Sequence, residues 1–71
     1  MSEKDAALLR AIVAAGTGYE LASRIGVTPQ ALSQWERVPP LRVLDVERVT
    51  GVPRHELRPD IYPAPEQARA S

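Results

Sequence analysis

The sequence predicts an all-α protein, folded as a compact bundle of about five short helices. Three observations indicate this class. Apolar residues recur at spacings of three and four, as they do along one face of a helix. Capping residues precede several of these segments, and glycine or proline follows them. No segment alternates apolar and polar residues as a half-buried strand does.

The first helix is expected to begin at the N-terminus of the chain. Ser2 and Asp5 have the three-residue spacing of a capping box, and acidic residues are favoured in a first helical turn. Gly16 is a suitable C-terminal cap. The residues expected to form its apolar stripe are Leu8, Leu9, Ile12 and Val13.

A second helix of about eight residues is expected after Gly16. Thr17 and Glu20 stand at the capping-box distance, and Gly26 closes the segment. The residues of its apolar face are Leu21, Ala22 and Ile25.

The third helix carries the strongest start signal in the chain. Thr28 can accept a hydrogen bond from an amide of the next turn, and Pro29 is suited to the first helical position. We expect the helix to run from Pro29 through Trp35 and to end near Val38, before Pro39-Pro40.

A fourth helix is expected from roughly Leu41 to Thr50, with Gly51 past its end, and Pro53 to Leu57 can form a last short turn. The apolar residues of the fourth helix lie around most of its circumference. Such a helix is buried on several sides, either at the centre of the domain or against a second subunit. The apolar residues concerned are Leu41, Val43, Leu44, Val46 and Val49.

Length and composition indicate one small domain. The chain has 71 residues and no cysteine, so neither a disulfide nor a cysteine-ligated metal supplements its thin core. We assign residues 1–62 to one folded domain. Residues 63–71, which contain Pro63 and Pro65, are expected to form a disordered C-terminal tail.

The charge balance does not itself indicate a nucleic-acid partner. Nine basic residues cancel nine acidic ones, although the basic set is eight arginines and the single Lys4. Arginine suits bidentate contacts with phosphates and bases, but a high-GC genome also enriches it. No apolar run reaches the ~18 residues of a membrane span, and the first residues lack the charged-then-apolar layout of a signal peptide. We expect a soluble, cytoplasmic protein without a membrane partner.

The junction of the second and third helices has the spacing of a helix-turn-helix. Only residues 26–28 separate the two helices, and Gly26 can adopt the positive φ of a sharp turn. The apolar residues expected to share one core are Leu21, Ile25, Val27, Leu32 and Trp35. The alternative is a helical hairpin without a DNA role. VTGVPRHEL at 49–57 imitates the same turn, but Glu47 stands where a small residue is needed.

The stretch TGYELASRIGVTPQALSQWERVPPLRVLDVERVTGVPRHELRPDIYP resembles the Cro/YdaS-like helix-turn-helix regulators of bacteria and their prophages. The resemblance covers residues 6–62. It implies a lambda-repressor/Cro-like fold that binds operator DNA, commonly as a dimer, and regulates transcription. Some members are described as antitoxins paired with a toxin. This chain departs from the family at Gly18, where a phosphate-contacting glutamine is common, at Glu36, where basic residues are common, and at Pro53, where Ser or Thr often caps the last helix.

We therefore interpret residues 1–62 as a helix-turn-helix DNA-binding domain, with the third helix as its candidate recognition helix. With Leu32 and Trp35 facing inward, Gln30, Ser33 and Gln34 face outward, where they can read base edges in a major groove. Ala31 is small enough for close approach and for contact with a thymine methyl group. The alternatives are that this face is only a solvated surface and that Trp35 stacks on nucleic acid. Candidate contacts to the DNA backbone are Thr17, Gly18, Tyr19, Arg24, Thr28, Pro29, Arg37 and Arg42.

Two functions follow. The first is a transcriptional regulator, a Cro-like repressor that binds a short palindromic operator in double-stranded DNA as a homodimer, and is associated with the nucleoid when bound. Its dimer surface would use the apolar residues of the fourth helix. The second is an antitoxin-type module whose main partner is a protein such as a cognate toxin. Neither function uses a cofactor or a metal, and His55, the only histidine, suits a structural hydrogen bond better than catalysis.

Overall fold

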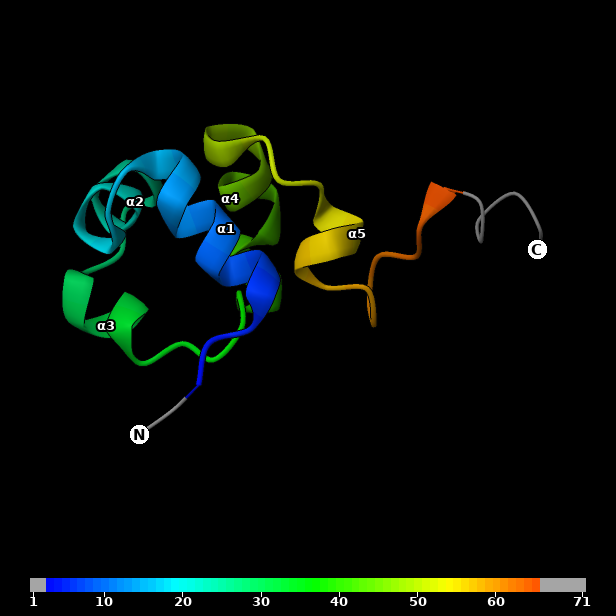
Figure 1. The fold of residues 1–71 in the computed structure, drawn as a ribbon, viewed down its shortest axis with the longest axis horizontal. Coiled ribbons are helices and arrows are strands. Elements are labelled where there is room, and N and C mark those ends of the chain that lie inside the picture. The colour runs from blue at the N-terminus through cyan, green and yellow to red at the C-terminus, as the bar shows by residue number, and fades with distance from the viewer. Residues whose placement is uncertain (1–2, 66–71) are drawn as a thin grey trace.

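The structure, a computed structural model, describes residues 3–65. The regular secondary structure of this part of the chain is all helical, and it has a Cro-like helix-turn-helix fold, which confirms the predicted fold class. Figure 1 shows α1 crossing the middle of the molecule against α4, with α2 and α3 to one side and α5 to the other. The elements in chain order are α1 (Ala6–Ala15), α2 (Gly18–Ile25), α3 (Pro29–Ser33), the 3₁₀ turn η1 (Pro40–Arg42), α4 (Val43–Thr50) and α5 (Arg54–Leu57).

Helix α1 begins later than the sequence analysis predicted. Its N-cap is Asp5, whose carboxylate accepts the backbone N–H of Leu8 at 2.8 Å. The backbone N–H of Asp5 is bonded to the carbonyl oxygen of Glu36, so Asp5 is extended and lies outside the helix. Asp5 therefore serves as the cap itself and not as the third residue of a capping box. Ser2, the predicted cap, lies outside the described residues.

The buried face of α1 also differs from the predicted stripe. Leu8 is buried and Ile12 partly buried, as expected, but Leu9 is 49% exposed and Val13 is 76% exposed. The face of α1 that packs against the other helices instead carries the small side chains of Ala7 and Ala11. Alanine allows the backbones of packed helices to approach closely, which explains why the larger side chains lie on the outside.

Helix α2 and its ends are as predicted. The Thr17 hydroxyl accepts the N–H of Glu20 at 3.1 Å, and Gly26 ends the helix with a φ of 79°. The residues that it buries are Leu21, Ala22 and Ile25. The prediction succeeded here because both caps and the apolar face are local features of the sequence.

Helix α3 is shorter than predicted, since it ends at Ser33 and does not continue through Trp35. The N–H of Gln34 bonds to the carbonyl of Ala31, and that of Trp35 bonds to the carbonyl of Leu32, so the last turn has tightened to three-residue spacing. The ammonium group of Lys4 also binds carbonyls that a longer helix would need. These contacts from outside the segment are absent from its local pattern.

Helix α4 begins at Val43, after the 3₁₀ turn that follows Pro39. Val43 and Val46 are fully buried, whereas Leu41 lies in the 3₁₀ turn and is 93% exposed. Leu44 is 49% exposed, so within the single chain the apolar side chains of this segment are not all buried, and burial of Leu41 and Leu44 against a second subunit stays a prediction. The buried core comprises Ala7, Leu8, Ala11, Leu21, Ala22, Ile25, Leu32, Val38, Val43, Val46 and Leu57.

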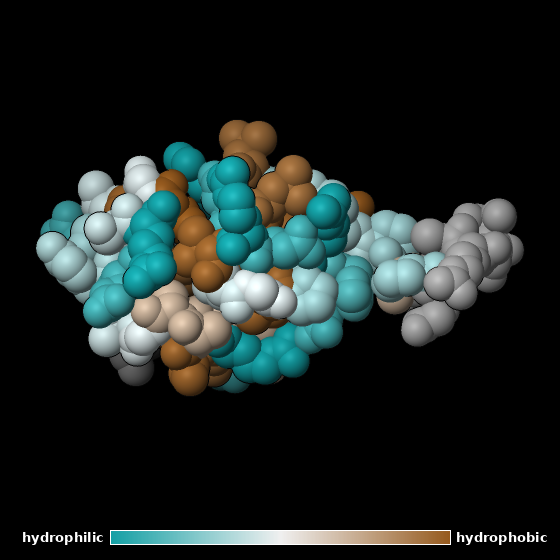
Figure 2. Space-filling model, turned by 90° about the horizontal axis from the view of Figure 1, so that it is seen from above, coloured by the Kyte–Doolittle hydropathy of each residue, from teal (hydrophilic) through white to brown (hydrophobic). Residues whose placement is uncertain are grey.

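Apolar side chains also reach the surface. Figure 2 shows brown apolar atoms exposed between teal hydrophilic side chains on the face seen from above. Among residues 3–65, the large apolar side chains that are exposed are Leu9, Val13, Tyr19, Leu41, Leu44 and Ile61. Scattered apolar side chains of this kind are common on soluble domains.

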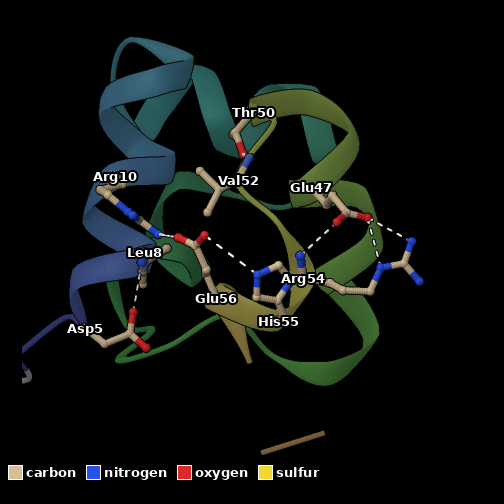
Figure 3. Close-up of polar contacts among 9 residues, drawn as sticks. All are labelled: Asp5, Leu8, Arg10, Glu47, Thr50, Val52, Arg54, His55 and Glu56. Carbon is tan, nitrogen blue, oxygen red and sulfur yellow. Dashed lines mark hydrogen bonds and ion pairs between the residues drawn. The ribbon is translucent and has the colours of Figure 1, made fainter. Parts of the chain in front are cut away.

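Helix α5 packs against α4 and α1. Its N-cap residue is Pro53, which has no side-chain acceptor, and the Glu47 carboxylate of α4 accepts the N–H of Arg54 instead (Figure 3). On the other side, Arg10 of α1 pairs with Glu56 (Figure 3). Polar contacts at both ends therefore hold this short helix, while Leu57 enters the core.

The predicted tail begins beyond the last core contacts. Tyr62 still packs against the core, and residues 63–65 run away from the helices (Figure 1). Residues 66–71, most of the tail that was predicted to be disordered, lie outside the described residues. No helix within residues 3–65 is long and apolar enough to span a membrane.

Candidate nucleic-acid interface

The turn between α2 and α3 fixes how α3 is presented. The backbone N–H groups of Gly26 and Val27 both bond to the carbonyl of Ala22, the latter at 3.0 Å. Gly26 has the left-handed conformation that glycine adopts without strain. The chain thereby reverses within three residues, and Leu32 of α3 packs into the core with only 3% of its surface exposed.

The opposite face of α3 is open to solvent, as predicted. The side chains of Gln30, Ala31, Ser33 and Gln34 are all exposed. Neither glutamine side chain makes a hydrogen bond within the described part of the chain. Each amide group therefore keeps its donors and its acceptor free for a ligand.

Ser33 differs from the two glutamines. Its hydroxyl group donates to the carbonyl of Gln30 at 2.8 Å, which occupies its one proton. The oxygen lone pairs remain available, so Ser33 presents an acceptor to a ligand.

Trp35 lies beyond the end of α3 and is partly buried against the core. This position supports the interpretation that Trp35 packs in the core, and it speaks against the alternative that Trp35 stacks on nucleic acid. It also anchors the chain directly after Gln34.

The two threonines of the motif use their hydroxyl oxygens as helix caps. Thr17 accepts from Glu20, and Thr28 accepts the N–H of Ala31 at 3.0 Å. Gly18 follows the first cap and is packed so that an added Cβ would lie 3.5 Å from a methyl carbon of Leu32, an ordinary contact distance. Pro29 is exposed at the start of α3.

Next to these helix starts, the outer face of α2 carries a shallow, open hollow of about 310 Å³. Tyr19, Glu20, Ser23 and Arg24 line it. Tyr19 is 70% exposed. Ser23 was not among the predicted site residues.

The three predicted phosphate-binding arginines are not equivalent. Arg24 and Arg42 form no ion pair with any of residues 3–65, so their charges are uncompensated there. Arg37 lies 3.7 Å from the carboxylate of Asp60. Its charge is therefore partly balanced.

The Asp60 carboxylate is held in its charged form by Arg58, which binds it through two N–H groups at 2.9 and 2.7 Å. These hydrogen bonds lower the pKa of Asp60 from 3.8 to about 2, with smaller contributions from the charges of Arg58 and Arg37. Arg58 also donates to the carbonyl of Val38. The network fixes the chain after α5 against the loop after α3.

The residues predicted for a dimer surface divide into two groups. Val43 and Val46 are fully buried in the core of the chain, which corrects their assignment to a surface that a partner could cover. Val49 is partly buried against the same core. Only Leu41 and Leu44 offer large exposed apolar surface.

The sequence analysis did not predict that Lys4 binds the C-terminal end of α3. Its ammonium group reaches residues 28 to 31 positions further along the chain. A contact of that sequence separation has no periodic signal. The composition offers the one signal of this contact in the sequence, because Lys4 is the single lysine in a chain with eight arginines.

Comparison with known proteins identifies the relatives of this chain. Residues 8–66 match the family described as bacterial toxin YdaS. The chain is 37% identical over 68 residues to the Gene 30 protein of Enterobacteria phage phi80, covering 89% of this chain and 93% of that protein. The solved structure of the Cro protein from the putative prophage element Xfaso 1 in Xylella fastidiosa strain Ann-1 is 43% identical, with a TM-score of 0.77. That likeness covers 82% of this chain and 97% of the Cro chain.

Proposed function

The chain belongs to the family described as bacterial toxin YdaS, and from that premise we propose that it is a sequence-specific DNA-binding regulator of the phage and prophage type. In this proposal α3 enters the major groove of double-stranded DNA. The likeness to a prophage Cro protein supports the proposal, since both chains have the same arrangement of helices.

One observation carries the proposal: the exposed face of α3 offers uncharged hydrogen-bonding groups that have no partner in the described chain. Gln30 and Gln34 can each pair with the N6 and N7 atoms of adenine, and Ser33 can accept from an exocyclic amino group. Ala31 leaves room beside them for a thymine methyl group. Such a face can distinguish base pairs through directional hydrogen bonds that do not depend on charge.

The backbone contacts in this proposal flank α3. Arg24 and Arg42 supply positive charge that has no ion-pair partner among residues 3–65. Arg37 would bind a phosphate once its ion pair with Asp60 is broken. The exposed Tyr19 and Pro29 would lie against the sugar–phosphate chain, and backbone N–H groups near Thr17, Gly18 and Thr28 would donate hydrogen bonds to phosphate oxygens. With a net charge of zero, the chain should bind random DNA weakly.

A homodimer on a palindromic operator completes the proposal. Leu41 and Leu44 are the remaining candidates of the predicted dimer surface, because both are exposed. A two-fold axis would place two copies of α3 about one DNA turn apart, ~34 Å. Occupation of an operator that overlaps a promoter would exclude RNA polymerase, which is the action of a repressor.

The proposal is tested by selecting bound sequences from a pool of random DNA duplexes. We expect one enriched palindromic sequence and, by sedimentation, a complex with two protein chains per duplex. Sedimentation of the free protein at micromolar concentration should then be compared with that of the complex. A free species of 7.8 kDa would show that the chain dimerises only when it is bound to DNA. Recovery of unrelated sequences would contradict the proposal.

A second candidate function is an antitoxin-type module with a protein partner such as a cognate toxin. The zero net charge and the 93% exposure of Leu41 favour this alternative, because both suit a protein surface. The same selection separates the two functions, since a protein-binding module would enrich no DNA sequence. A toxin gene adjacent to the gene for this chain would favour the second.

A further inference from the structure

We propose that Lys4 is a positioning residue for DNA recognition: its ammonium group fixes the C-terminal end of α3 and so sets the direction in which Gln34 is presented. The inference rests on the proposed function of α3. It concerns a residue outside the helix-turn-helix, on the segment that precedes α1.

The contacts of Lys4 converge on the end of α3. Its Nζ atom donates to the carbonyl oxygens of Leu32 at 3.1 Å, Ser33 at 3.2 Å and Trp35 at 2.8 Å. These carbonyls belong to the last residues of the helix and to the chain just beyond it, where intrahelical partners run out. A positive charge at this end also interacts favourably with the helix dipole.

Lysine has the chemistry that this site requires. An ammonium group has three N–H donors around one compact atom, and here three carbonyl oxygens surround it. The planar guanidinium group of arginine spreads its donors in a fork and suits flat, bidentate partners. The chain has arginine at its other eight basic positions, yet it has lysine at this one.

The segment that carries Lys4 is itself tied to the core. The backbone N–H of Asp5 donates to the carbonyl of Glu36 at 2.8 Å, and the Asp5 side chain caps α1 through Leu8. Leu8 is fully buried. A continuous set of contacts therefore connects the central helix to the loop that follows α3.

Gln34 lies where this set of contacts has its largest effect. The residues before and after it, Ser33 and Trp35, both have their carbonyl oxygens bound by Lys4. Helix α3 has only five residues, so its own hydrogen bonds hold it weakly. Without Lys4, the backbone of Gln34 would be free to fray, and the amide would lose its fixed direction.

Two roles for Lys4 can be separated by experiment, since a lysine near a DNA interface can also bind a phosphate. A phosphate contact strengthens binding to every sequence and adds ~0.9 to the slope of log K against log salt. A positioning residue strengthens binding only to the preferred sequence and leaves that slope unchanged. Its ammonium group is already occupied by three carbonyls.

The test measures binding of wild type, Lys4→Met, Lys4→Arg and Arg48→Met to the selected duplex and to an unrelated duplex, over a range of salt concentrations. Arg48→Met is the control for loss of one charge, because exposed Arg48 pairs with Asp45 on its own helix. For Lys4→Met we expect affinity for the selected duplex to fall about tenfold, with affinity for the unrelated duplex and the salt slope unchanged. Lys4→Arg should lose part of the same selectivity, and Arg48→Met none.

Equal losses on both duplexes with a lower salt slope would overturn the proposal in favour of a phosphate contact. Wild-type behaviour of Lys4→Met would overturn it as well. If Lys4→Met is unfolded at the assay temperature, Lys4→Arg decides, and wild-type selectivity in that variant would contradict the required geometry. A wild-type protein without any preferred sequence would overturn the function proposed for α3 together with this inference.

Discussion

The carboxylate of Glu47 accepts the backbone N–H of Arg54 at 2.8 Å and also pairs with the Arg54 guanidinium group at 3.0 Å. Pro53 precedes Arg54 and has no side chain that could cap α5. A residue of α4 therefore performs the task of an N-cap for the next helix. The hydrogen bond from the Arg54 backbone is the main reason why the pKa of Glu47 is lowered.

Glu47→Ala should reduce the free energy of unfolding by ~1 kcal/mol, the usual cost of losing an N-cap. Glu47→Gln is the matched variant, because an amide oxygen can still accept the N–H of Arg54 and should preserve most of the stability. Urea denaturation of both variants and wild type measures the difference. Equal stability of Glu47→Ala and wild type would show that this contact does not stabilise α5.

Gly26→Val should destabilise the protein by ~1–2 kcal/mol, because a β-branched residue is strained at positive φ. Nothing lies within 4 Å of an added Cβ at Gly26, so the cost comes from backbone conformation and not from a clash. Gly18→Ala is the control, as its added Cβ makes an ordinary contact with Leu32. Melting temperatures compare the three proteins, and an unchanged value for Gly26→Val would contradict the turn.

The pairing of Asp60 with Arg58 predicts a pH dependence at the acid end. The pKa of Asp60 falls from 3.8 to about 2 in the folded chain, so the pair stabilises the fold at pH values above 3.8. This stabilisation should be lost as the pH falls from 3.8 through about 2. NMR titration of the Asp60 carboxyl group measures the shift, which Arg37→Met should largely preserve. A midpoint near 3.8 in wild type would contradict the pairing.

Gln34→Ala should weaken binding to the selected duplex by ~1–3 kcal/mol while leaving the fold and the affinity for unrelated DNA unchanged. The reason is that the exposed amide of Gln34 has free hydrogen-bonding groups at the end of α3. Circular dichroism checks the fold, and fluorescence anisotropy measures the two affinities. Equal affinity of variant and wild type for the selected duplex would remove Gln34 from the reading face.

The parts of the fold that were predicted correctly depend on local features of the sequence. Thr17 and Thr28 cap the helices that begin directly after them, and Gly26 supplies a turn that few other residues allow. The exposed face of α3 followed in the same way from its spacing relative to Leu32. For this reason the helix-turn-helix and its candidate reading face could be derived from the residues alone.

The remaining features depend on contacts between distant segments. Lys4 ends α3 from across the fold, and Glu47 caps α5 from the preceding helix. The burial of Val43 but not of Leu41 depends on where η1 turns. Periodicity within one segment carries no information on such contacts, so the helix lengths and the burial of individual residues around α4 were predicted less well.

The claim that α3 reads DNA is tested most directly by mapping the amide chemical shifts of the ¹⁵N-labelled chain as the selected duplex is added. We expect the largest changes at residues 28–34 and smaller changes at residues 17–19, where α2 begins. An unrelated duplex should leave residues 30–34 nearly unperturbed. Changes concentrated in α5 or around Leu41, with α3 unaffected, would contradict the account.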